Sequence, residues 1–410
     1  MKYVIFIPDG SSDYPIDELG GMTPLKVANT PNIDRMAKAG FGGLTNNVPE
    51  EYTPGSDVAN MSIFGFNPAN YYTGRGPLEA GSMGIETTDR DVIFRCNTIT
   101  QKDGYMDDFN AGHITSEEAE ILMESLNDYF NEKYDDFKGK FYPGVSYRHL
   151  FVYSCKTIEQ AQLLASLVTM PPHDISGESL DENTSGDKWN EELPSFIKQI
   201  MWESQNILEN HEINKKRINE NKKPANMVWL WGQGVTPSLP NFKEVYGLNA
   251  AVITGVDLLK GIGVFAGFDI IDVPGATGYF DTDYVAKGKY AIEALKNHDV
   301  LFVHVEAPDE AGHASNVEEK VKSIERIDKY IVGPVLNSLK GEKFRAAILP
   351  DHPTPISVGT HTRDDVPLII YSSDRKGDDC DSFDEKGVLK GSLDKKEGYK
   401  LMNRLINNDF

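Results

Sequence analysis

The chain has 410 residues, of which 40% are apolar and 25% charged, a composition typical of a globular protein rather than a disordered one. The length suggests two or three domains. With 63 acidic and 41 basic side chains, the formal net charge is −22, which argues against non-specific binding to nucleic acid or to anionic membranes.

No run reaches the ~20 apolar residues of a membrane span. The amino-terminal MKYVIFIPDG is too short in its apolar part for a signal peptide and predicts a buried first strand. After it, short β-branched and aliphatic runs alternate with helical patterns, which predicts a parallel sheet covered by helices. The predicted strands are Tyr3–Pro8, Ala250–Thr254, Asp269–Val273, Val300–Val305, Arg345–Leu349 and Leu368–Tyr371. The predicted helices include Ile33–Ala39, Glu117–Tyr129, Ile158–Leu167, Tyr284–Leu295 and Val317–Leu339.

The clearest parallel strands lie near the two ends of the sequence, while the middle is strongly polar over residues 183–223. We therefore expect a discontinuous α/β domain formed by residues 1–85 and 240–410. A smaller inserted α/β or α+β domain is expected over residues 86–239. Three distant cysteines, Cys96, Cys155 and Cys380, fit a reducing cytoplasm and exclude a disulfide scaffold or a cysteine zinc site.

Acidic and imidazole side chains follow three of the predicted strands. Parallel sheets bind ligands beyond the carboxyl ends of their strands, so these side chains are expected to meet at one edge. The set comprises Asp9, Asp309, His313, Asp351, His352 and His361. Taken singly, Asp9 also suits a turn or a helix cap, and His313 an ordinary structural histidine. The three groups together favour a site.

Carboxylates mixed with imidazoles suit divalent cations of the zinc or manganese type. Asp309 and His313 are four residues apart, so on a helical turn they face the same way and can share an ion. Six ligands suffice for two ions, and two ions form the clamp used in phosphoryl transfer.

Ser56, in the segment TPGSDVANMS (residues 53–62), has two interpretations. Ser56 precedes an apolar helix start and suits a helix N-cap. It also suits an activated nucleophile, because a helix N-terminus and a metal both stabilise an oxyanion. Asn60, one turn later, is expected to donate to a phosphoryl oxygen.

Several motifs together resemble a known family. They are PDG, PGSDVANMSIFGFNP, YYTGRGPLEAGSMGI, FRCNTIT, NAGHITSEEAE, YRHLFV, PPHD, PDEAGH and DHPTP with its trailing HTR. With them the whole chain resembles cofactor-independent phosphoglycerate mutase, in the archaeal-type branch of the alkaline phosphatase superfamily. The resemblance implies an alkaline phosphatase-like domain with a largely parallel sheet, interrupted by the inserted domain.

The resemblance also assigns the ligands to individual ions. Asp309, His313 and His361 would hold one metal, and Asp9, Asp351, His352 and the Ser56 hydroxyl the other. Two divalent ions are implied; manganese is favoured, with zinc, cobalt and magnesium as alternatives. Ser56 would take the phosphoryl group of 3-phosphoglycerate and return it to the 2-hydroxyl, with no need for 2,3-bisphosphoglycerate.

Substrate contacts are implied for His113, Arg148 and Lys260, and acid–base roles for His173 and Asp174. Each has an ordinary alternative: PPH is also a rigid loop, Arg148 also suits the surface, and Lys260 also suits the end of its helix. The longer bacterial enzyme has a cluster of arginines that has no evident counterpart in this sequence. The segment WLWGQGVTP, from Trp229, suggests a pocket loop, although its tryptophans also suit a core.

Three other functions compete with the mutase. A homoserine kinase-like phosphotransferase of the same branch would keep the metals and the nucleophile but change the acceptor. A related metal-dependent phosphatase or phosphopentomutase-like enzyme would use water or another sugar. A non-catalytic metal-binding protein is disfavoured, because Ser56 and all six ligand positions are filled. The sequence leaves the oligomeric state open.

Overall fold

A computed structural model describes residues 1–378 and 380–410. The chain divides into two compact units, residues 1–72 with 238–410, and residues 73–237. The sequence places these boundaries at 85/86 and 239/240. The first differs because helix α5 (Arg75–Ser82) packs on the strands of the second unit. No helix in the described ranges has the length and apolar character that crossing a membrane requires.

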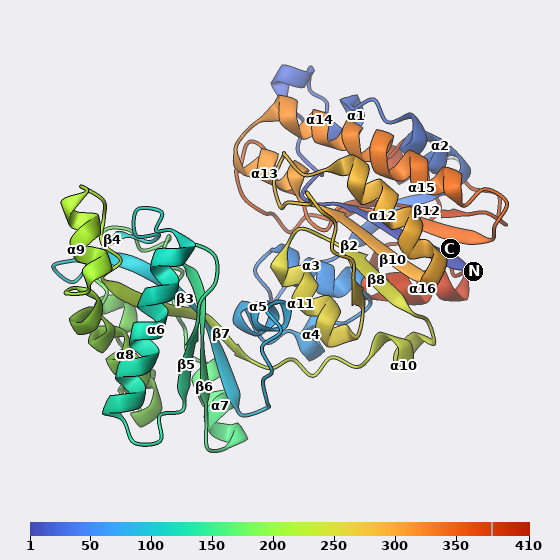
Figure 1. Cartoon of the computed structure of the whole chain (residues 1–410). Coiled ribbons are helices and arrows are strands. Elements are labelled where there is room, and N and C mark those ends of the chain that lie inside the picture. Colours follow the sequence, from blue (N-terminus) through green and yellow to red (C-terminus); the bar gives the residue numbers. More distant parts are fainter. Residues whose placement is uncertain (379) are drawn as a thin grey trace. The chain divides into compact units, whose positions relative to one another are not determined.

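An eight-stranded sheet forms the centre of the first unit, in the order β13-β2-β12-β11-β1-β10-β8-β9 (Figure 1). The pairs β11–β1, β1–β10, β10–β8 and β8–β9 are parallel, whereas β12 is antiparallel to both of its neighbours. The expected largely parallel sheet is therefore confirmed. The strands are β1 (Lys2–Pro8), β2 (Phe41–Asn46), β8 (Ala250–Ile253), β9 (Asp269–Ile270), β10 (Val300–Val305), β11 (Phe344–Ile348), β12 (Val366–Ser372) and β13 (Lys396–Glu397).

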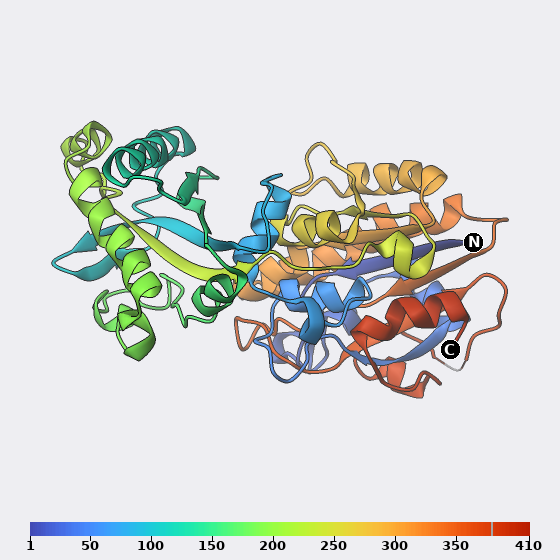
Figure 2. The ribbon, with the colours of Figure 1, turned by 90° about the horizontal axis from the view of Figure 1, so that it is seen from below.

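Helices lie on both faces of this sheet (Figures 1 and 2). On one face, Val4 and Phe6 of β1 share a core with side chains of α2, α12, α14 and α15. On the other, Phe302 stacks on Phe268 and contacts Phe64, which ends α3. The helices are α1 (Pro24–Val27), α2 (Pro31–Ala39), α3 (Ser56–Ile63), α4 (Pro68–Tyr71), α10 (Phe242–Tyr246), α11 (Asp257–Ala266), α12 (Tyr284–Asn297), α13 (Ala307–His313), α14 (Val317–Ile327), α15 (Gly333–Ser338) and α16 (Leu401–Asn407).

The predicted helix Val317–Leu339 is helical without a break from Val317 to Ser338, but its geometry changes part-way along. A π-helical segment, Asp328–Val332, separates α14 from α15. Pro334 follows this segment, and a proline lacks the N–H of a regular helix and clashes with the preceding turn. The wider π turn accommodates it.

The second unit is an antiparallel sheet with helices packed against it, so it is α+β rather than a parallel α/β unit. Strand β3 (Asp91–Lys102) pairs with β4 (Tyr105–Asp108), β6 (Arg148–Ser154) and β7 (Met227–Val235), and β5 (Gly139–Tyr142) pairs with β6. Its longer helices are α6 (Ser116–Lys133), α7 (Ile158–Ala165), α8 (Glu192–Leu208) and α9 (Glu212–Asn219). The segment expected to be a pocket loop is strand β7, and Trp229 and Trp231 are core residues.

Candidate metal centre

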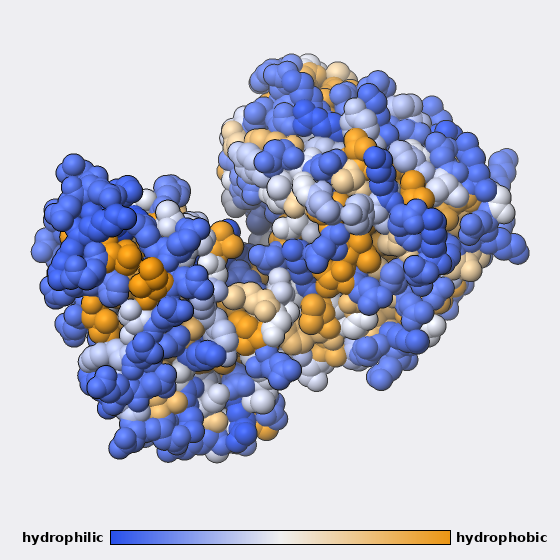
Figure 3. Space-filling view, in the orientation of Figure 1, coloured by the Kyte–Doolittle hydropathy of each residue, from blue (hydrophilic) through white to orange (hydrophobic). Residues whose placement is uncertain are grey.

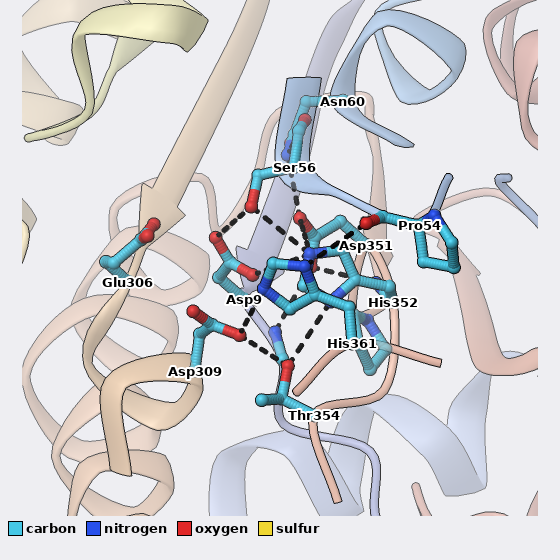
Figure 4. A network of polar contacts seen from close by, with 12 residues as sticks. Asp9, Pro54, Ser56, Asn60, Glu306, Asp309, Asp351, His352, Thr354 and His361 are labelled. Atoms are coloured by element: carbon cyan, nitrogen blue, oxygen red, sulfur yellow. Dashed lines mark hydrogen bonds and ion pairs between the residues drawn. The ribbon is translucent and has the colours of Figure 1, made fainter. Parts of the chain in front are cut away.

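Three adjacent strands end at the candidate site. β1 is parallel to both β10 and β11, so the residues that follow these strands meet at the carboxyl edge of the sheet. Asp9 follows β1, helix α13 with Asp309 and His313 follows β10, and Asp351 with His352 follows β11. The structure brings all six predicted ligands and Ser56 together here, and Figure 4 labels each of them except His313.

Asp309, His313 and His361 form the first group, with one ligand atom from each residue lying within 4.8 Å of the others. Nδ1 of His313 lies 3.0 Å from the carbonyl of Gly359, and Nδ1 of His361 lies 3.3 Å from that of Pro54. Because a carbonyl only accepts, each Nδ1 donates, and both Nε2 atoms are left to face each other at 2.9 Å.

Two imidazole lone pairs this close to each other and to the Asp309 carboxylate need a positive charge between them. In the metal-free site a proton fills this need: the hydrogen bond to Asp309 raises the pKa of His313 to about 9. Burial would raise the pKa of Asp309, but the bonds from His313 and His361 hold it well below its usual value. The donor set fits a divalent cation in place of that proton.

Asp9, Asp351 and His352 form the second group. One oxygen of Asp351 accepts the N–H groups of Gly10 and His352, and the other accepts the Asn60 amide at 2.8 Å. Asp9 is fully buried, and its Oδ1 has no hydrogen-bond partner among the described residues. Burial, followed by the charge of Asp351, raises the pKa of Asp9 well above its ordinary value. A cation here would offset this cost.

Ser56 faces this second group and does not cap its helix. Gly55 is the N-cap of α3, without a side-chain bond, and the helix begins at Ser56 itself. The Ser56 hydroxyl lies 3.2 Å from Nε2 of His352 and 3.4 Å from Oδ2 of Asp9. The N-cap interpretation is therefore wrong. Asn60 uses its amide on Ser56 O and Asp351 Oδ2, so the expected donation to a phosphoryl oxygen does not fit this arrangement.

His304 and Glu306, which the sequence did not reveal as part of the site, lie beside Asp9. Asp9, His304 and Glu306 form a third cluster of candidate ligand atoms. His304 Nε2 lies 2.8 Å from Asp9 Oδ2, while its Nδ1 faces Thr254 and its carbonyl accepts from Lys287. Burial lowers the pKa of His304 to about 3 and raises that of Glu306 to about 8. The signal that could have revealed His304 is the presence of a histidine inside the otherwise apolar strand VLFVHV.

Comparisons with known proteins show the family of this chain. The family model described as 2,3-bisphosphoglycerate-independent phosphoglycerate mutase matches residues 37–214. One relative is 2,3-bisphosphoglycerate-independent phosphoglycerate mutase 2 from Methanothermobacter thermautotrophicus. It is 49% identical to this chain, and the alignment covers 99% of this chain and 98% of the relative. The 2,3-bisphosphoglycerate-independent phosphoglycerate mutase from Methanosarcina acetivorans is also 49% identical, covering 99% and 100%. The chain belongs to the 2,3-bisphosphoglycerate-independent phosphoglycerate mutase family.

Two solved structures extend the likeness to the fold. The PH0037 protein of Pyrococcus horikoshii has a TM-score of 0.83 at 30% identity, covering 99% of this chain and 96% of the other. A cofactor-independent phosphoglycerate mutase from Thermoplasma acidophilum has a TM-score of 0.68 at 26% identity, covering all of both chains.

Four of the five residues that the phosphoglycerate mutase resemblance implies for the substrate lie in the second unit. His113 is in the loop before α6, and Arg148 begins β6; both are exposed. His173 and Asp174 are 3.5 Å apart on a loop, with more than half of each side chain exposed. The fifth, Lys260, lies in α11 of the first unit and pairs with Asp257. It is the fourth residue of its helix, so it does not cap the helix end.

The sequence did not reveal a group of three arginines, one of which, Arg95, contacts Trp231. Arg95 of β3 lies over the Trp231 ring at 4.2 Å and pairs with Glu79. Burial, together with the positive charges of Arg75 and Arg148, lowers the pKa of Arg95, although Glu79 opposes this. His173 contacts the edge of the same indole. The sequence hides this group because Arg75, Arg95 and Arg148 come from α5, β3 and β6.

Proposed function

We propose that this chain interconverts 3-phosphoglycerate and 2-phosphoglycerate without 2,3-bisphosphoglycerate, through a phosphoserine at Ser56. The position of the Ser56 hydroxyl carries the proposal: it is within 3.4 Å of Asp9 and His352 and free of any capping role. Full-length relatives at 44–49% identity are named as this mutase, one of them as probable, which disfavours the homoserine kinase-like alternative.

We propose two divalent cations, one held by Asp309, His313 and His361, the other by Asp9, Asp351, His352 and the Ser56 hydroxyl. Manganese is favoured, with zinc, cobalt and magnesium as alternatives, because each group mixes carboxylate with imidazole. When bound, such ions neutralise the charge on the phosphoryl oxygens and favour ionised serine. His304 supports the second group by holding Asp9.

In the proposed reaction Ser56 would react as the alkoxide, having released its proton to solvent water, and it returns to that state at the end of the cycle. Its Oγ attacks phosphorus while the bond from phosphorus to the 3-oxygen breaks. The leaving oxygen takes a proton from the His173–Asp174 pair. The 2-hydroxyl then returns a proton to that pair and attacks the phosphoserine, which frees Ser56. Such transfer depends on positioning and charge neutralisation rather than on covalent chemistry elsewhere.

We assign the glycerate end of the substrate to His113, Arg148, His173 and Lys260, with Asp174 as the acid–base partner. The chemistry of Arg148 supports this assignment, because it is exposed at the start of β6 and a guanidinium group matches carboxylate and phosphate geometry. We further propose that the enzyme works in the cytoplasm, in glycolysis or gluconeogenesis. Three free cysteines are consistent with a reducing compartment.

The direct test is an assay of the purified protein with Mn²⁺, 3-phosphoglycerate and no bisphosphoglycerate. We expect 2-phosphoglycerate to form and a phosphoserine to be found at Ser56 by mass spectrometry. Failure with manganese, zinc, cobalt and magnesium alike, together with phosphorylation of homoserine from ATP, would establish the kinase instead. Release of phosphate in place of 2-phosphoglycerate would establish a phosphatase.

Ser56→Ala tests the nucleophile. We expect it to abolish turnover and the phosphoserine while changing the bound-metal content by less than about twofold, because the other three ligands of that ion remain. Ser62→Ala is the matched control: Ser62 lies in the same helix, is also buried, and has no hydrogen-bond partner for its hydroxyl among the described residues. Substantial activity in Ser56→Ala would contradict the mechanism.

A further inference from the structure

Thr354 connects the two proposed metal groups. It lies two residues after His352 and is completely buried. Its hydroxyl donates a hydrogen bond to Oδ1 of Asp309, a member of the first group, and lies 3.3 Å from Nδ1 of His352, a member of the second (Figure 4). Nothing in the mechanism above uses this hydroxyl.

The single proton of the hydroxyl fixes the direction of both bonds. Asp309 is a carboxylate held between His313 and His361, and a carboxylate only accepts. The Thr354 proton is therefore committed to Asp309, and toward His352 its oxygen can only accept. His352 must then carry its proton on Nδ1, which leaves the lone pair on Nε2.

That lone pair is directed at the second group. Nε2 of His352 lies 3.2 Å from Ser56 Oγ, 3.4 Å from Asp351 Oδ2 and 3.7 Å from Asp9 Oδ1. We propose that Thr354 is a positioning residue that fixes the Nδ1–H tautomer of His352 while it orients Asp309, so that one hydroxyl prepares both groups for their cations. This inference rests on the proposed metal centre but not on the identity of the substrate.

A buried ammonium group holds Thr354 in place. Lys320 of α14 is fully buried, and its Nζ donates to Thr354 O at 2.8 Å, to Asp13 Oδ2 at 2.7 Å and to Ser12 O at 3.4 Å. These three acceptors match its three protons. Asp13 also accepts the N–H of Ile356, so the loops after β1 and β11 are tied together around Thr354.

Two glycines leave room for the threonine side chain and for little else. A Cβ at Gly10 would lie 2.6 Å from the Thr354 hydroxyl and 2.5 Å from Oδ1 of Asp309. A Cβ at Gly312 would lie 2.4 Å from the Thr354 carbonyl and 2.8 Å from its methyl group. All four distances are shorter than non-bonded contacts allow, so the side chain is enclosed in a space shaped for it.

The first test needs only the unsubstituted protein. We label the histidines with ¹⁵N, remove metal, and record the two-bond ¹H–¹⁵N correlations of the ring of His352, sequentially assigned, near neutral pH. We expect a protonated Nδ1 and an unprotonated Nε2. The opposite tautomer, or an equal mixture of both, would overturn the inference whatever the enzyme's activity.

The second test compares two substitutions. Thr354→Val keeps the shape but removes the hydroxyl; we expect a mixed tautomer at His352 and about 10- to 100-fold weaker Mn²⁺ binding by calorimetry. Thr354→Ser keeps the hydroxyl and should restore both readouts. Thr184→Val is the control for losing a buried hydroxyl: Thr184 is 1% exposed, donates to Leu180 O, and lies in the second unit.

Each result has a definite meaning. Unchanged tautomer and Mn²⁺ affinity in Thr354→Val would overturn the inference, as would equal losses in the serine and valine variants, because the methyl group and not the hydroxyl would then matter. If Thr354→Val does not fold, the tautomer of the unsubstituted protein still decides. A mutase assay that fails while the tautomer and Mn²⁺ results hold would reject the proposed function alone.

Discussion

At the residue scale, the same place in the first metal group can hold either a proton or a cation. Nε2 of His313 and Nε2 of His361 lie 2.9 Å apart beside the Asp309 carboxylate, so one positive charge between them is required. Without metal, His313 supplies it, with its pKa raised to about 9 through Asp309. Burial likewise raises the pKa of Glu306 to about 8.

These two shifts predict how the stability of the metal-free protein depends on pH. Between the unfolded pKa and the folded one, the folded state binds a proton that the unfolded state does not, so stability falls as pH rises. This window is about 6.5 to 9 for His313 and about 4.3 to 8 for Glu306. We expect the Tm of the metal-free protein to fall by on the order of 2 °C per pH unit from pH ~6.5 to ~8.

Of the other shifted groups, Asp9 has a pKa raised by burial and acts in the same direction, whereas histidines with a lowered pKa act mainly below it. Burial lowers the pKa of His304 to about 3, so its charge cost is felt only below its unfolded pKa of about 6.5. Lys287, lowered to about 8 by burial, acts above the window. With saturating Mn²⁺ the decline should become shallower, because the cation replaces the proton on His313 and removes the contribution of that residue. Scanning calorimetry checks this, and a Tm that rises over this range in metal-free protein would contradict it.

Sequence reasoning reached the proposed ligands because Asp9, Asp309 and Asp351 come soon after apolar strands, with the three histidines nearby in the sequence. It missed residues whose role depends on neighbours brought in from elsewhere. In the sequence His304 is only one residue of strand β10, and its role becomes visible when its Nε2 is found 2.8 Å from Oδ2 of Asp9. In the sequence Thr354 is only one residue of the DHPTP motif, and its role becomes visible when its hydroxyl is found to donate to Asp309, 45 residues earlier.

At the element scale, the strand pattern was most informative where strands are continuous and buried. β1, β10 and β11 are within two residues of their predicted bounds at either end, since their apolar runs have no interruption. β2 (FGGLTN) was missed because glycine is rare in strands. Gly43 is required there: a Cβ would lie 2.6 Å from Leu393. The predicted strand Asp269–Val273 shortens to the two residues of β9, at the edge of the sheet.

Gly10, which follows β1 and lies against Asp309 of α13, allows a prediction. Gly10 follows β1 with φ +58°, and a Cβ there would collide with Asp309 and Thr354. Gly20, later in the same connection, has a similar φ of +67°, but a Cβ would meet nothing within 4 Å. Comparing the two separates backbone strain from displacement of the metal centre.

We expect Gly20→Ala to cost about 1–2 kcal/mol of unfolding free energy, the left-handed strain alone, with unchanged Mn²⁺ affinity. Gly10→Ala should lower the unfolding free energy by the same strain. It should in addition weaken Mn²⁺ binding about 10-fold or more, because Asp309 moves. Denaturant unfolding and calorimetric Mn²⁺ titration measure the two quantities. Equal Mn²⁺ affinities in the two variants would show that the Gly10 contact does not position the site.

At the scale of the whole molecule, the net charge of −22 has to be reconciled with an anionic substrate. Part of the acidity belongs to the proposed ligands, which cations would neutralise. Hydrophilic side chains cover most of the face in Figure 3, so much of the remaining charge is solvated surface. The positive groups proposed for the substrate, among them Arg148 and Lys260, act locally against this background. This predicts a short-range rather than a long-range attraction.

The second unit has the features of an independently folding domain. It is one continuous segment, residues 73–237, with its own apolar core between the sheet and helices α6, α7 and α8. Its two ends lie together: Val235 pairs with Val92, and a Cβ on Gly234 would collide with the carbonyl of Thr73. Cutting the chain at these ends therefore breaks few interactions within the unit.

We predict that a fragment of residues 73–237 folds by itself into a native, cooperative structure and does not bind Mn²⁺. Every proposed metal ligand lies outside it. Thermal unfolding followed by circular dichroism, a dispersed ¹H–¹⁵N spectrum and Mn²⁺ calorimetry test this. The control is the fragment with Trp229→Ala, which removes a 1%-exposed side chain bonded to Met170 O and should cost about 3–5 kcal/mol. If the fragment is unfolded, its core depends on the first unit; if it binds Mn²⁺ as tightly as the full chain, the metal centre has been assigned to the wrong unit.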